Sequence, residues 1–152
     1  MHRILGISVV VLALVATLGV PGWSGAQEQV FRVNNLAEPE SLDPGLVTGV
    51  PEHRIISNLF EGLAVNDPKD LSPQPGMARS WTVSKDGLTY TFTLRDAAWT
   101  DGKKVTAHYF VYAWERVLNP KTGAKYAQQL FYVKNGEDYN KGKITDFGQV
   151  GV

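Results

Sequence analysis

The first 26 residues have the layout of a secretory signal, and this limits how much of the chain is left to fold. A short basic start at residues 1–3 precedes an almost unbroken apolar run at residues 4–18, and Pro21-Gly22 interrupts any helix before the small residues 24–26. A membrane-spanning helix needs about 20 apolar residues, and this run is shorter. We therefore expect cleavage after Ala26, and removing 26 residues from 152 leaves 126.

The chain contains no cysteine, which excludes disulfide frameworks, thiolate metal sites, a cysteine nucleophile and a lipid anchor. Fifteen Lys and Arg residues balance fifteen Asp and Glu residues, and the loss of Arg3 with the signal leaves fourteen against fifteen, or −1. No net positive charge is available for the phosphates of nucleic acid or an anionic membrane surface. These features predict an exported protein, released into a periplasm or the medium.

Hydrophobic periodicity in the first half of the mature chain predicts a mixture of strand and helix. Residues 30–33 resemble a short strand, and the proline-rich connector after them cannot continue it. A helix is expected to begin at Pro51 and to end at Gly62, and a proline-rich loop is expected at residues 66–76. The apolar side chains predicted to share one side of this helix are Ile55, Ile56, Leu59, Phe60 and Leu63.

The second half predicts a hairpin followed by helices, which together give an α+β fold class. Strands at residues 81–83 and 89–94 flank Lys85-Asp86-Gly87, and Asp-Gly is a common hairpin turn. A further helix is expected after Thr106 as the N-cap and before Asn119-Pro120, and a third at residues 124–133. The predicted buried side of the second helix is formed by Phe110, Val111, Trp114, Val117 and Leu118.

No group of side chains forms a recognisable catalytic or metal-binding motif, which favours a binding protein over an enzyme. His53 and His108 have no companion ligand at helical spacing. Two alternatives stay open. The first is a secreted carbohydrate-active enzyme using Glu38 or Asp43, or a sugar-binding protein, although carboxylates on a proline-rich connector have no fixed separation. The second is an interaction domain that keeps residues 4–20 as a membrane anchor.

A series of sequence blocks points to a family. The blocks are Glu38-x-x-Ser41-Leu42-Asp43-Pro44, Gly49-Val50-Pro51-Glu52, Leu59-Phe60-Glu61-Gly62-Leu63, Pro75-Gly76-x-Ala78-x-Ser80-Trp81, Tyr90-Thr91-Phe92-x-Leu94-Arg95, Trp99-x-Asp101-Gly102-x-x-Val105-Thr106-Ala107 and Phe110-Val111-Tyr112-x-Trp114-x-Arg116. In this order and spacing they resemble the solute-binding proteins of ABC peptide importers. The resemblance runs from about Phe31 to Gly148.

The resemblance implies that this chain is the first quarter of a two-lobed periplasmic binding protein whose ligand lies in the cleft between the lobes. Residues 27–43 would begin the discontinuous first lobe, residues 44–142 would form a small α/β subdomain, and residues 143–152 would start the return to lobe one. It implies no cofactor and no catalytic role. The expected partners are an oligopeptide and the permease subunits of the importer, which provide the only membrane contact, and we expect a monomer.

The same resemblance implies four ligand-binding residues. Thr48, Gly49 and Val50 align with the stretch that pairs with the peptide backbone, and Tyr126 aligns with a tyrosine that lines the cleft. An extended peptide bound as an added strand is held by its main chain, so its binding need not depend on its side chains. The family often has a carboxylate where this chain has Thr48. Relatives in the superfamily carry dipeptides, nickel complexes, haem or oligosaccharides, and the sequence leaves these ligands open as alternatives.

Overall fold

The computed structural model describes residues 29–152, so the predicted signal at residues 1–26 lies outside the described residues. The chain divides into two units, residues 1–34 and residues 35–152. In the first unit the predicted strand at residues 30–33 is wrong. Among the described residues none pairs with this stretch, and Phe31 is 90% exposed. An extended segment without a pairing neighbour is not a stable strand.

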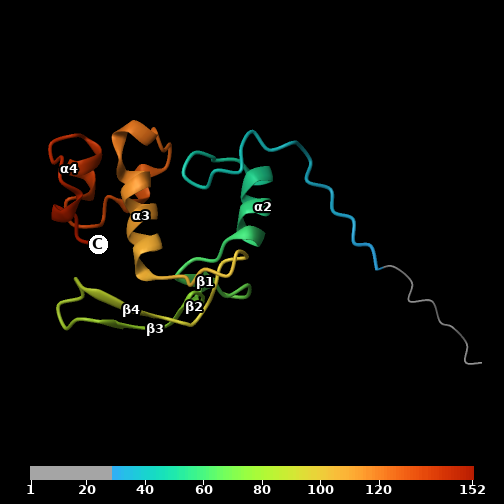
Figure 1. Ribbon diagram of the computed structural model, residues 1–152, viewed down its shortest axis with the longest axis horizontal. Coiled ribbons are helices and arrows are strands. Elements are labelled where there is room, and N and C mark those ends of the chain that lie inside the picture. Colours follow the sequence, from blue (N-terminus) through green and yellow to red (C-terminus); the bar gives the residue numbers. More distant parts are fainter. Residues whose placement is uncertain (1–28) are drawn as a thin grey trace, which may run out of the picture. The chain divides into compact units, whose positions relative to one another are not determined.

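The second unit combines helices with two small antiparallel sheets, so the mixed α/β character predicted from the sequence is confirmed (Figure 1). Within residues 29–152 no helix is both long enough and apolar enough to cross a membrane. The elements in chain order are α2 (Val50–Leu59), β1 (Ala64–Asn66), β2 (Pro73–Pro75), β3 (Ala78–Val83), β4 (Tyr90–Leu94), α3 (Ala107–Leu118), the 3-10 helices η1 (Pro120–Thr122) and η2 (Ala127–Leu130), α4 (Gly136–Asn140) and the 3-10 helix η3 (Phe147–Gln149).

Helix α2 begins where the sequence predicts but ends earlier. Pro51 occupies its first turn, where a missing N–H leaves no helical bond unmade. The helix ends at Leu59, because the backbone of Phe60 is extended with φ −128° and ψ 146°. The predicted end at Gly62 is therefore wrong by three residues. Of the predicted apolar side, Ile55, Ile56 and Leu63 are half-buried, whereas Leu59 and Phe60 are exposed.

The predicted loop at residues 66–76 contains a strand, β2, which pairs with β1. Pro75 lies opposite Ala64 and Pro73 lies opposite Asn66. Proline occurs in a ladder only where its missing N–H is not needed, and the short two-stranded sheet β1–β2 meets that condition. Directly after β2, a Cβ atom on Gly76 would lie 2.6 Å from the carbonyl oxygen of Gly62. Glycine at position 76 therefore allows the two backbones to approach.

The predicted hairpin is confirmed as the antiparallel pair β3–β4 (Figure 1). Gly87 in its turn has φ +74°, which glycine adopts without strain. Trp81 lies opposite Phe92, and their ring centroids are 6.2 Å apart. The register shifts between Ala78 and Ser80, so β3 carries an irregularity at its start.

Helix α3 contributes to the hydrophobic core of the second unit. It begins after Thr106 and ends before Asn119 as predicted, although the Thr106 side chain makes no capping hydrogen bond. Leu118 is fully buried and clusters with Tyr139 and Val150. The apolar side chains packed around this cluster are Leu130, Phe131, Val133, Ile144 and Phe147.

The helix predicted at residues 124–133 is wrong. Only the 3-10 helix η2 forms there, with i to i+3 hydrogen bonds such as the one from the Gln129 N–H to the Tyr126 carbonyl. The chain then reverses at Asn135, whose φ is +60°. Gly136 follows so closely that a Cβ atom there would lie 2.7 Å from the carbonyl oxygen of Leu130. A continuous helix through this region could not place α4 against α3.

Candidate functional site

The segment that leads into α2 is folded into a hydrogen-bonded turn. The carbonyl of Asp43 accepts the N–H groups of Leu46 and Val47 at 3.1 and 3.3 Å. The Asp43 side chain also accepts the N–H of Gly45 at 3.0 Å, and the Asp43 N–H donates to the Ser41 hydroxyl at 3.1 Å. Aspartate side chains stabilise turns by bonding to the backbone two residues on. The proline-rich connector therefore has a defined shape just before residues 48–50.

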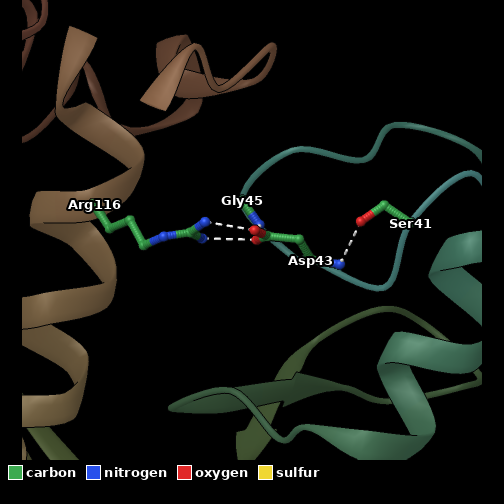
Figure 2. Close-up of polar contacts among 4 residues, drawn as sticks. All are labelled: Ser41, Asp43, Gly45 and Arg116. Carbon is green, nitrogen blue, oxygen red and sulfur yellow. Dashed lines mark hydrogen bonds and ion pairs between the residues drawn. The ribbon is translucent and has the colours of Figure 1, made fainter. Parts of the chain in front are cut away.

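The same aspartate is clamped by a residue far along the chain (Figure 2). Arg116 of α3 donates to both carboxylate oxygens of Asp43, with N–O distances of 2.7 and 2.5 Å. Two parallel bonds from a planar guanidinium fix orientation as well as distance. The guanidinium also lies close to the backbone at position 45, because a Cβ atom there would lie 2.8 Å from the near nitrogen of Arg116 and would push it aside. The turn is therefore held against α3.

This pairing counts against an acid-base role for Asp43. The hydrogen bonds from Arg116 hold the pKa of the Asp43 carboxyl below its usual value, and the N–H of Gly45 acts in the same direction. A general acid needs a raised pKa instead, so that it still carries a proton near neutral pH. Within residues 29–152, no three or more His, Cys, Asp or Glu side chains are arranged to hold a metal ion.

A second carboxylate, Glu52 in the first turn of α2, lies beneath this segment. It is only 5% exposed. One of its oxygens accepts the backbone N–H of Glu40 at 2.9 Å, and the N–H of Glu40 is the main cause of its lowered pKa. Its other oxygen has no hydrogen-bond donor among the described residues. Glu52 thus joins the start of α2 to a residue twelve positions earlier.

Two of the four predicted ligand-binding residues line a hollow of about 390 Å³. Thr48 and Gly49 contribute to it from one segment, and Gly123 and Lys125 contribute from the segment after α3. A wider hollow of about 660 Å³ lies between α2 and β1 and contains none of the four residues. The smaller hollow is therefore the better candidate site.

The other two predicted residues lie next to the lining residues of this hollow in sequence. Val50 is the first residue of α2 and is 61% exposed. Tyr126 follows Lys125 and is 48% exposed. The structure thus brings the neighbours of both residues together, although neither Val50 nor Tyr126 lines the hollow itself.

The backbone around Thr48 offers unused hydrogen-bonding groups. Gly49 is extended, with φ −86° and ψ 157°. The N–H and C=O of Thr48 make no hydrogen bond within the part of the chain that the structure describes. Val50 is the first residue of a helix, where the N–H has no partner inside the helix. Alternate residues of an extended chain present these groups on the same edge, so this segment can accept another extended chain.

Sequence reasoning missed two residues of this site. It considered Asp43 as a possible enzyme carboxylate on a connector without fixed geometry, and it named Glu52 within a family sequence block. Neither the pairing of Asp43 with Arg116 nor the burial of Glu52 follows from local spacing, because both contacts join segments that are far apart in sequence. The local pattern that could have pointed to Glu52 is its spacing from Gly49, which lies three residues earlier at the predicted start of the helix.

Comparison with known proteins finds similar proteins over most of this chain. Residues 72–146 match the family described as bacterial extracellular solute-binding proteins, family 5 middle. The dipeptide-binding protein DppE of Bacillus subtilis is 47% identical over 117 residues, which are 76% of this chain and 21% of that protein. The periplasmic oligopeptide-binding protein OppA of Escherichia coli is 46% identical over 128 residues, which are 81% of this chain and 23% of that protein.

Solved structures agree with the sequence comparison. The crystal structure of Haemophilus influenzae OppA in complex with RPPGFSPFR matches with a TM-score of 0.73 and 45% identity, over 78% of this chain and 23% of that one. The Escherichia coli murein tripeptide binding protein MppA matches with a TM-score of 0.70 and 42% identity, over 76% of this chain and 23% of that one. This chain therefore spans less than a quarter of the length of these relatives.

Proposed function

We propose that the whole protein captures oligopeptides for an ABC importer. The proposal rests on the match of residues 72–146 to the family 5 bacterial extracellular solute-binding proteins and on the similarity to DppE and OppA, of which this chain spans 21% to 23%. The observation that carries this proposal is the unpaired backbone of Thr48, which directly follows the turn that the Asp43–Arg116 pair holds against α3. Relatives with solved structures hold peptides, among them an OppA of Listeria monocytogenes bound to peptide.

In this proposal the peptide binds as an added strand along residues 48–50. The N–H and C=O of Thr48 and the N–H of Val50 bond to the peptide main chain, which gives affinity with little dependence on peptide sequence. Tyr126 presents its hydroxyl to the ligand from the segment across the hollow. The exposure of Val50 and Tyr126 leaves both residues accessible in the described part of the chain, which supports such contacts.

The proposed whole protein has two lobes that close around the peptide. Residues 27–43 begin the first lobe, residues 44–142 form the small α/β subdomain, and residues 143–152 start the return to the first lobe. The subdomain assignment is supported by the elements from α2 to α4, which fall within residues 50–140. The second lobe supplies the other half of the site, so affinity depends on closure, which removes water from the ligand.

We further propose that the protein is a periplasmic monomer that is not an enzyme and that delivers its peptide to the permease subunits of the importer. A cleaved signal at residues 1–26 exports it. Several relatives are themselves named periplasmic oligopeptide-binding proteins, which supports this location. The engagement of Asp43 by Arg116 supports a structural rather than a catalytic role for this carboxylate.

The test uses the full-length protein, with calorimetry against a mixture of tri- to pentapeptides. Val50→Pro removes one N–H donor, and proline is compatible with the first position of a helix. We expect it to weaken binding by about 1 to 3 kcal/mol, because the peptide carbonyl that it served stays unpaired. Tyr126→Phe should cost roughly 0.5 to 1.5 kcal/mol by the loss of one hydroxyl hydrogen bond.

Thr48→Ala is the matched control, because a residue that acts through its backbone tolerates the loss of its side chain. We expect its peptide affinity to equal that of the wild type. Melting temperatures are measured for the same variants, so that a loss of folding is not mistaken for a loss of binding. Wild-type affinity in Val50→Pro would contradict the proposed role of this edge.

A further inference from the structure

We propose that Glu52 is a positioning residue for the edge formed by residues 48–50. Its buried carboxylate occupies the space that a side chain at position 49 would need, and so sets the path of the backbone beside it. The inference rests on the proposed function, because it concerns the segment that would pair with the peptide.

The first observation is steric. A Cβ atom on Gly49 would lie 2.0 Å from one carboxylate oxygen of Glu52, far inside any real contact distance. The backbone of Gly49, with φ −86° and ψ 157°, is open to any residue. A side chain at position 49 would therefore meet no conformational barrier, but it would displace the Glu52 carboxylate from its present place. The carboxylate of Glu52 is what fills that space.

The second observation is the hydrogen bond at the other end of the carboxylate. The oxygen that accepts the Glu40 N–H at 2.9 Å anchors the side chain to the start of the turn segment. Glu52 therefore touches the chain on both sides of residues 41–48. A shift of this carboxylate would release Glu40 and would leave the space beside Gly49 empty.

The third observation is burial without full pairing. The oxygen of Glu52 nearest to Gly49 is sealed from solvent and has no donor among the described residues. A buried, incompletely paired carboxylate lowers stability compared with an apolar side chain of similar size. Stability therefore does not explain why a carboxylate is buried at position 52, and the geometry points to a role in shaping the adjacent edge, residues 48–50.

The test is a double-mutant cycle in the full-length protein, with affinity measured by calorimetry against the tri- to pentapeptide mixture. We expect Gly49→Ala and Glu52→Ala each to weaken binding about tenfold, the size expected when one main-chain hydrogen bond to the peptide is lost. The combined variant should lose no more than either single variant, because truncating Glu52 makes room for the new Cβ atom. An additive loss of about a hundredfold would overturn the inference.

Glu52→Gln separates shape from simple stability. Its amide oxygen can still accept the Glu40 N–H, so we expect affinity within about threefold of the wild type. The amide also fills the same space, so Gly49→Ala should still weaken binding about tenfold in the Glu52→Gln background. If Glu52→Ala does not fold, the inference is tested by Glu52→Gln alone and by Glu52→Gln combined with Gly49→Ala. Glu137→Gln, on an exposed carboxylate of α4, is the matched control and should leave affinity unchanged.

Failure of the inference is distinguishable from failure of the proposed function. If the wild type does not bind the peptide mixture, or Val50→Pro binds as well as the wild type, the proposed function is wrong. If Val50→Pro weakens binding while Glu52→Ala lowers only the melting temperature, the edge binds peptide and the positioning role of Glu52 is wrong.

Discussion

At the residue scale, the Asp43–Arg116 pair decides the shape of the turn that precedes the candidate edge. Both side chains are about two-thirds buried or more, with exposed fractions of 27% for Asp43 and 35% for Arg116. Ion pairs on an open surface contribute little, whereas a partly buried bidentate pair leaves an unpaired charge when one partner is removed. The pair is therefore a sensitive point of this structure.

Arg116→Lys tests the geometry of the pair separately from its charge. Lysine keeps the positive charge but cannot form two parallel bonds to a carboxylate. We expect the free energy of unfolding to fall by about 1 kcal/mol, measured by urea denaturation of the full-length protein. Lys143→Arg, at the exposed pair with Asp138, is the control and should be neutral. Unchanged stability in Arg116→Lys would show that charge alone holds the turn.

The pH dependence of stability tests the charge of Asp43. Its pKa is lower in the folded protein, chiefly because of the hydrogen bonds from Arg116. The stabilisation is therefore complete above the unfolded-state pKa of about 4 and is lost as the pH falls through the folded-state value. We expect Asp43→Asn to unfold more easily than the wild type at pH 7 and to differ less from it at pH 2 to 3. A constant difference across this range would contradict the assignment.

At the element scale, two glycines next to or within the sheets are needed for different reasons. Gly87 has φ +74°, and a Cβ atom there would meet no other atom within 4 Å, so its requirement is conformational. Gly76 has no such backbone angle, and its requirement is the nearby carbonyl of Gly62. The two causes predict different responses to the same substitutions.

Asparagine distinguishes these causes, because it tolerates the left-handed conformation better than alanine does. We expect Gly87→Ala to lower the free energy of unfolding by about 1 to 2 kcal/mol and Gly87→Asn to recover part of that loss. Gly76→Ala should cost about 1 to 3 kcal/mol, and Gly76→Asn at least as much, because a backbone oxygen cannot move aside. Thermal or urea unfolding of the four variants gives the comparison. Recovery by Gly76→Asn would contradict the steric explanation.

These elements also show what the sequence could predict. The Asp86-Gly87 turn and the alternation of Phe92 and Leu94 with threonines are local patterns, and the hairpin that they predict is confirmed. The strand at Pro73–Pro75 depends on pairing with β1. The end of α2 depends on the extended backbone at Phe60, which leads the chain into β1. Local composition carries neither kind of information. The residues of the candidate edge came from family resemblance, and their role stays a prediction.

At the scale of the whole molecule, the described core is small and lies where the helices α3 and α4 meet. Leu118 is fully buried at its centre, and the side chains around it come from residues 130–150. Many large apolar side chains elsewhere in residues 29–152 are exposed. This chain spans 21% of DppE and 23% of the Haemophilus influenzae OppA structure, and the further parts of such proteins can cover a surface of this kind.

Leu118→Ala tests whether this core governs global stability. Truncating a fully buried leucine typically costs about 2 to 5 kcal/mol, and we expect a loss in that range for the full-length protein. Leu88→Ala is the matched control, because Leu88 lies in the hairpin turn and is 83% exposed. Its change should stay within about 0.5 kcal/mol. A small effect of Leu118→Ala, measured by urea unfolding, would mean that the core of the whole protein lies elsewhere.

The long reach of the Asp43–Arg116 contact also has a consequence for the order of folding. The two residues are 73 positions apart, so their pairing closes a large loop of chain. Closing such a loop costs conformational entropy before the contact can stabilise the fold. The hairpin β3–β4 and the helix α3 instead depend on contacts between residues that are close in sequence. The turn at residues 43–47 is thus expected to take its final form late. The site for an incoming strand would then be completed only after most of the structure that supports it.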